Sequence, residues 1–171
     1  MESDVYRLRE VLPGDFDVVF TSYGALEWLP DLRPWARVAA SYVRPGGFLY
    51  VVELHPTAMI FSDEPGVERL EVGYPYRTGP RPLRFEEEGT YADYEAPIRM
   101  PEYVWNHGIG DVVTAIIDAG LVLEYLHEHD RTVYQQLPFL ERDEDGWWRL
   151  PASMPAQPLL YSLRARRPAD G

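Results

Sequence analysis

Two short apolar runs, 16–22 and 48–54, flank a stretch in which apolar residues recur at helical spacing. The first run, FDVVFTS, alternates little and is typical of a strand buried on both faces. The stretch between them predicts a helix with Asp31 as its N-cap and an apolar stripe formed by Leu32, Trp35, Ala36, Ala39 and Val43. Pro45-Gly46-Gly47 ends that helix, because proline cannot continue it. Residues 16–55 therefore predict one βαβ unit.

Regular patterns return after residue 103. A second amphipathic helix is predicted from Ile109, Val112, Val113, Ile116 and Ile117, and Gly120 follows it at the position where glycine commonly ends a helix. Residues 121–128 and 159–166 predict two further strands. The link between these strands, rich in tryptophan and proline, predicts no regular structure.

Residues 56–103 carry repeated prolines and glycines, and only 83–91 favours strand pairing. We interpret this segment as an excursion over the sheet that forms a lid. The whole chain, residues 1–171, is then expected to be one α/β domain. Its sheet is expected to be mostly parallel, with an antiparallel last strand.

Composition excludes several kinds of chemistry. The net charge of −12 opposes binding to nucleic acid or to anionic membranes. All 16 basic residues are arginine, so Schiff-base and Walker-type lysine chemistry are excluded, and the absence of cysteine excludes disulfides and thiolate catalysis. Without a signal-peptide pattern or a long apolar run, we expect a cytoplasmic location.

Four pieces of the sequence resemble class I S-adenosylmethionine-dependent methyltransferases. They are TSYGALEWLPDL at 21–32, an ExHP motif at 53–56, a tryptophan-histidine pair at 105–107, and DAGL at 118–121. The RPGG turn at 44–47 also recurs in that superfamily. The resemblance implies a partial Rossmann-like fold and methyl transfer from S-adenosylmethionine to a small molecule.

The resemblance also implies the cofactor contacts, which come from Asp4, Thr21, Ser22, Tyr23, Gly24 and Trp28. It covers only the family's C-terminal half, from the fourth strand onward. Each βαβ unit needs about 30 residues, and 15 precede Phe16 here. We therefore expect the glycine-rich half of the cofactor site to be missing, and we interpret residues 1–15 as the tail of a strand and a loop.

A missing first half has a structural consequence. The strand at 16–22 would lie at the edge of the sheet, and an exposed apolar edge recruits partners. We therefore expect a homo-oligomer in which this edge or the surface beside it is covered, or a separate polypeptide that supplies the missing half.

The candidate catalytic residues are His55 and His107, and the candidate substrate contacts are Trp105 and Glu53. His55 ends a predicted strand and could accept a proton from the methyl acceptor, although it could equally cap the strand end beside Pro56. The Trp105–His107 pair could close over a substrate or cap the second helix.

His127 and His129 share one face of a predicted strand, but a metal site would need a third ligand, so no metal is expected.

Three functions are open for this chain. It could be a methyltransferase, a non-enzymatic remnant that oligomerises through its exposed strand, or a module that binds a small apolar ligand. The sequence alone leaves open whether the chain is an enzyme.

Overall fold

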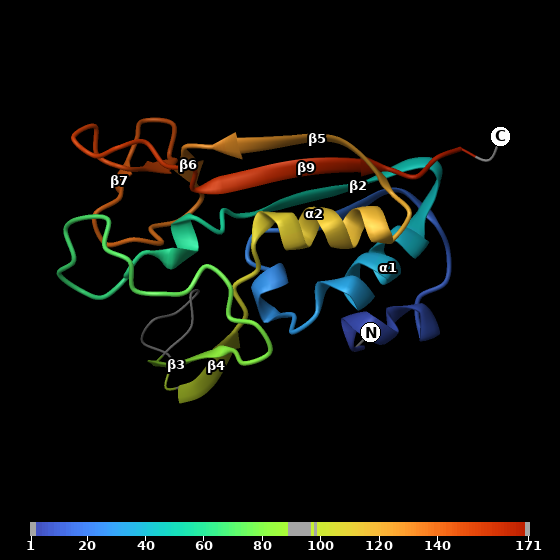
Figure 1. Cartoon of the computed structure of the whole chain (residues 1–171), viewed down its shortest axis with the longest axis horizontal. Coiled ribbons are helices and arrows are strands. Elements are labelled where there is room, and N and C mark those ends of the chain that lie inside the picture. The colour runs from blue at the N-terminus through green and yellow to red at the C-terminus, as the bar shows by residue number, and fades with distance from the viewer. Residues whose placement is uncertain (1–2, 89–96, 98, 170–171) are drawn as a thin grey trace.

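In the computed structural model, which describes residues 3–88, 97 and 99–169, two helices pack side by side against one face of a four-stranded sheet (Figure 1). The helices are α1 (Leu32–Tyr42) and α2 (Ile109–Asp118). The strands, in their order across the sheet, are β1 (Phe16–Ser22), β2 (Val43–Leu54), β9 (Leu160–Arg166) and β5 (Val122–His129). The predicted βαβ unit is therefore confirmed. Its predicted turn is wrong, because α1 ends at Tyr42 and Pro45-Gly46-Gly47 lies within β2.

The sheet is mixed. Strand β1 pairs with β2 in parallel, and β9 is antiparallel to both of its neighbours, β2 and β5. The antiparallel direction of the last strand is as predicted. The prediction of a mostly parallel sheet is wrong, because β9 lies inside the sheet and makes two of its three strand pairs antiparallel.

Strand β1 lies at the edge of the sheet, as expected, and it is not buried on both faces. Its inner residue Val19 packs against the core beneath the helices. The side chains of Phe16, Val18 and Phe20 are 42%, 47% and 56% exposed. The Phe16 ring lies 5.9 Å, centre to centre, from that of Tyr42 on α1. Val18 and Phe20 lie on the other face of the sheet, and no helix of the described residues covers that face (Figure 1). These apolar side chains are therefore not buried by the rest of this chain.

Residues 56–103 contain the short 3-10 helix η3 (Ala58–Ile60) and an antiparallel hairpin of β3 (Leu83–Glu88) and β4 (Arg99–Val104). Strand pairing at 83–88 was predicted, and the predicted continuation to residue 91 lies outside the described residues. The hairpin projects from the rest of the fold near the start of α2 (Figure 1).

The segment before β9, for which no regular structure was predicted, contains three short strands. The link before β9 forms a small sheet of β6 (Arg131–Thr132), β8 (Trp148–Arg149) and β7 (Glu141–Arg142), packed over a second core of Ala58, Leu137, Leu140 and Leu159. Strands of two residues carry too little periodicity to be recognised in a sequence. The prediction that this link is irregular is therefore wrong.

The N-terminal segment is a 3-10 helix, η1 (Val5–Glu10), which packs on α1, so the expected strand tail is wrong. Asp4 caps this helix by accepting a hydrogen bond from the backbone N–H of Tyr6. A capping aspartate favours helical backbone in the residues that follow it.

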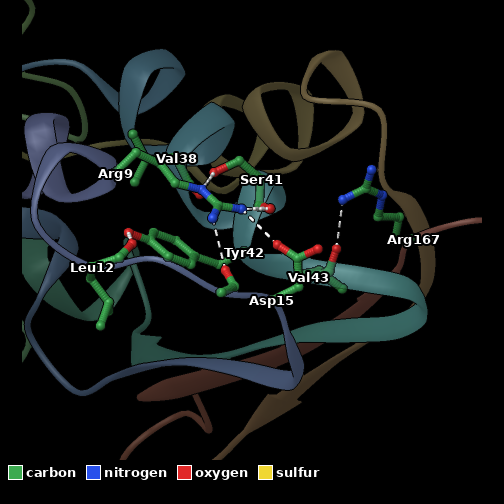
Figure 2. A network of polar contacts seen from close by, with 9 residues as sticks. Arg9, Leu12, Asp15, Val38, Ser41, Tyr42, Val43 and Arg167 are labelled. Atoms are coloured by element: carbon green, nitrogen blue, oxygen red, sulfur yellow. Dashed lines mark hydrogen bonds and ion pairs between the residues drawn. The ribbon is translucent and has the colours of Figure 1, made fainter.

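Arg9 of η1 fixes the C-terminal end of α1 (Figure 2). Its guanidinium donates to the Ser41 hydroxyl (3.0 Å), to the Ser41 carbonyl, to the Gly14 carbonyl (2.7 Å) and to Asp15 (2.9 Å). It also lies 4.1 Å from the centre of the Tyr42 ring. A cation at this end satisfies carbonyls that the helix leaves unpaired and opposes the negative end of its dipole.

We predict that Arg9→Ala lowers the free energy of unfolding by about 1–3 kcal/mol, because it removes several charge-assisted hydrogen bonds at once. Urea denaturation followed by circular dichroism measures the change. Arg7→Ala is the matched control, since the Arg7 side chain forms an exposed ion pair with Glu10, and its loss should change the free energy of unfolding far less. Equal losses in both variants would contradict this role for Arg9.

Candidate functional site

Strand β1 ends in a loop whose backbone is fixed by one carboxylate. Glu53, near the end of β2, accepts hydrogen bonds from the backbone N–H groups of Gly24 (2.5 Å), Ala25 (2.9 Å) and Leu26 (3.2 Å). The side chain of Glu53 is buried, and its burial raises its pKa, although the three N–H donors act in the opposite direction. The predicted substrate residue Glu53 thus holds a loop at the carboxyl edge of the sheet, where α/β folds bind ligands.

Gly24 has a positive φ of 75°, a conformation that favours glycine. A Cβ atom added there would lie 2.9 Å from the Glu27 carboxylate. Tyr23, beside it, is 45% exposed and donates its backbone N–H to the Val52 carbonyl. These two predicted cofactor residues therefore form a tight, solvent-exposed turn after β1, while Thr21 and Ser22 remain within the strand.

Glu27 lies on the short 3-10 helix η2 (Leu26–Trp28) that follows the turn. Burial, together with the nearby charges of Glu53 and Glu102, raises the pKa of Glu27 to about 7. The Glu27 backbone carbonyl accepts a hydrogen bond from the backbone N–H of Trp105 at 2.8 Å, which attaches the residue after β4 to the loop. A carboxylate that titrates near neutral pH is suited to general base catalysis.

Two cavities meet at Glu27. The tryptophan cavity, about 40 Å³, is lined by residues that include the predicted site residues Glu53, Trp105 and His107. The hairpin cavity, about 150 Å³, is lined by Trp28 and by residues of η3, the β3–β4 hairpin and the 134–137 segment. Glu27, Met59 and Asn106 contribute to both walls. The structure thus brings four of the predicted residues to the walls of two neighbouring cavities.

His55 and Asp4 do not line either cavity. His55 is buried; its Nδ1 accepts the Thr57 N–H (3.1 Å) and its Nε2 contacts the Glu128 carboxylate at 2.8 Å. Burial lowers the pKa of His55, and Glu128 partly offsets this effect. The arrangement matches the alternative in which His55 caps the end of its strand.

His107 lines the tryptophan cavity, and its Nε2 lies 2.7 Å from the Leu29 carbonyl. A carbonyl can only accept, so this nitrogen carries the proton and is held by the backbone. On β5, the His127 ring stacks on Tyr125 and His129 contacts the Ser162 hydroxyl at 3.0 Å. Among the described residues, no three acidic or histidine side chains are grouped so that they could hold a metal ion.

Sequence reasoning missed Asn106 and Gln136 as site residues. Asn106 lies between the two recognised residues Trp105 and His107, so its position in that motif was the available signal. Gln136 stands in an irregular segment with no motif, and only the tertiary structure brings it to the hairpin cavity.

We predict that the stability of this protein falls between pH 5 and pH 8 because Glu27 titrates. The pKa of Glu27 is about 7 in the folded protein and 4.5 in the unfolded chain, so the folded state binds the proton more tightly. This proton adds its full share to the free energy of unfolding below pH 4.5, and that share is lost as the pH rises through 7. Between pH 5 and pH 8, the free energy of unfolding of Glu27→Gln should therefore rise by about 2–3 kcal/mol relative to that of the wild type. Urea denaturation at both pH values measures the gain, and Glu144→Gln, on an exposed turn, controls for the loss of one charge. A constant difference between Glu27→Gln and the wild type would contradict the prediction.

No family model matches the chain, and no curated protein does. Among solved structures it is similar to an S-adenosylmethionine-dependent methyltransferase from Mesorhizobium loti (20% identity, TM-score 0.56, covering 96% of this chain and 68% of that one). A putative S-adenosylmethionine-dependent methyltransferase from Listeria monocytogenes (11%, 0.54, 91% and 62%) is also similar. So is the CcbJ methyltransferase from Streptomyces caelestis (16%, 0.54, 98% and 62%).

The chain thus spans about two thirds or less of the length of these solved structures. No described helix is long and apolar enough to cross a membrane. At these levels of identity the likeness concerns the fold. The chain has the α/β fold, with a mixed sheet, of S-adenosylmethionine-dependent methyltransferases.

Proposed function

We propose that this protein takes part in S-adenosylmethionine-dependent methyl transfer to a small-molecule acceptor. The observation that carries the proposal is the loop after β1, which Glu53 holds at the carboxyl edge of a methyltransferase-like sheet, directly beside the two cavities. The fold likeness supports the same assignment.

The residues present fit part of the cofactor. Gly24 lets the backbone turn closely under a ligand, and Tyr23 exposes its ring at the same point. These two residues would hold the methionine portion, and Trp28 would lie on the acceptor side, in the wall of the hairpin cavity. When bound there, S-adenosylmethionine supplies an electrophilic methyl group.

The protein's part in the reaction is then alignment and proton removal. Glu27 lies between the loop and the acceptor cavity and, with its pKa near 7, accepts the acceptor's proton at a carboxylate oxygen. The β3–β4 hairpin serves as a lid that limits water access to the cavity. His55 and His107 act as positioning residues, because the backbone and Glu128 hold their ring nitrogens.

Calorimetric titration with S-adenosylmethionine and S-adenosylhomocysteine tests the proposal. We expect saturable binding in the micromolar range, about 8 kcal/mol, which Gly24→Ala abolishes. Gly66→Ala is the matched control, since Gly66 also has a positive φ (87°) but no atom lies within 4 Å of an added Cβ. The absence of heat from the wild-type chain at millimolar cofactor would refute cofactor binding by this chain.

The exposed apolar corner at β1 favours a second candidate function, assembly with a second copy of the chain. Phe20 is 56% exposed and stacks on Tyr50 (5.9 Å between ring centres), and Val18 lies on the same face beside them. Apolar side chains at an unpaired strand edge favour association. We propose that this corner is covered in a homo-oligomer, whose second copy would contribute the cofactor contacts that this chain does not make.

Sedimentation equilibrium over a range of concentrations tests the assembly. We expect a concentration-dependent dimer that Phe20→Lys converts to monomer, because lysine at an edge opposes strand pairing. Val72→Lys, at a 68% exposed position away from the sheet, should leave the dimer intact. A wild-type chain that stays monomeric at all concentrations would rule out this candidate.

A further inference from the structure

The hairpin cavity is lined by buried polar atoms that have no hydrogen-bond partner among the described residues. Asn106 is 6% exposed; its Nδ2 donates to the Pro75 carbonyl at 2.9 Å, while its Oδ1 accepts from no described group. Neither amide atom of Gln136 has a partner in the described part of the chain. Buried polar side-chain atoms are paired in most proteins. The two unpaired carbonyl oxygens, Asn106 Oδ1 and Gln136 Oε1, therefore indicate a ligand that carries a hydrogen-bond donor.

The charge of the cavity wall indicates that this donor is positively charged. Three carboxylates line the cavity, those of Glu27, Asp63 and Glu102, and none of its described lining residues is arginine or histidine. Asp63 already accepts a hydrogen bond from the Tyr74 hydroxyl at 2.6 Å. The Glu27 carboxylate makes no hydrogen bond within the described residues, and Glu27 and Asn106 both line both cavities. A cationic donor satisfies both groups together.

The remaining wall is aromatic and apolar. Trp28 and Tyr74 line it, and the Phe85 ring meets Tyr74 edge-on with 5.7 Å between ring centres. Aromatic faces attract cations and pack against apolar bodies. The volume of about 150 Å³ accommodates on the order of ten non-hydrogen atoms.

From this combination we infer that the hairpin cavity binds a small amine in its protonated form, with an aromatic or apolar body. Its ammonium group lies between the Glu27 carboxylate and Asn106 Oδ1, and its body packs against Trp28, Tyr74 and Phe85. The further claim that this amine is the methyl acceptor rests on the proposed function. In that role Glu27 takes one proton from the ammonium nitrogen, which leaves the nitrogen lone pair free.

The titration of Glu27 gives this site a signature that a merely apolar cavity would not show. An alkylamine with a pKa of about 10 stays protonated at pH 6–8, whereas the ionised fraction of Glu27, with a pKa of about 7, rises about tenfold over this range. Amine affinity should therefore rise with pH up to about tenfold. The affinity of a neutral ligand of the same shape should not rise.

The experiment is calorimetric titration of the full chain, without S-adenosylmethionine, with phenethylamine and its neutral analogue 2-phenylethanol at pH 6 and pH 8. We expect phenethylamine to bind at least about tenfold more tightly than the alcohol at pH 8. Glu27→Gln should remove this preference and the pH dependence. Glu144→Gln, which removes one charge at a position that does not line the cavity, should bind like the wild type.

Equal affinity for the amine and the alcohol, binding of neither, or an unchanged preference in Glu27→Gln would overturn the inference. Adding S-adenosylmethionine and following methylated products by mass spectrometry separates this inference from the proposed function. Amine binding with the expected profile but no methylated product would leave the amine site standing and count against methyl transfer. Methylation of the alcohol, with no preference for binding the amine, would support methyl transfer and overturn the amine site.

Discussion

The arrangement of the site depends on the buried carboxylate of Glu53. Three successive backbone N–H groups of the loop after β1 donate to it, so a side chain on β2 fixes the path of the chain where β1 ends. Water cannot easily replace these bonds at a buried position, and an unpaired carboxylate there would be costly. The turn at Gly24 and the position of η2 follow from this one contact.

The same contact determines the chemistry of Glu27. Holding the loop against β2 brings a second carboxylate, that of Glu27, close to Glu53 and partly out of water, and Glu102 of β4 adds a third negative charge. Desolvation and like charges both disfavour ionisation, so the pKa of Glu27 moves toward neutrality. The group beside both cavities is thereby able to bind a cation or to accept a proton under ordinary conditions.

The two faces of the sheet differ in a way that relates stability to assembly. One face packs against α1 and α2, and Arg9 fixes the end of α1 from the N-terminal helix. On the other face, Val18, Phe20 and Tyr50 form an apolar corner. Burial of the first face stabilises the fold, whereas burial of the second requires a partner.

The sequence by itself determined the βαβ unit, α2 and the antiparallel last strand, because apolar spacing, Asp31 and Gly120 encode local structure directly. Motif resemblance also predicted Glu53, Trp105 and His107 as site residues, and these three line the tryptophan cavity. Only the tertiary structure placed β9 inside the sheet and brought Gln136 and Glu102 to the cavity. These features depend on contacts between segments far apart in the chain, and local periodicity carries no record of such contacts.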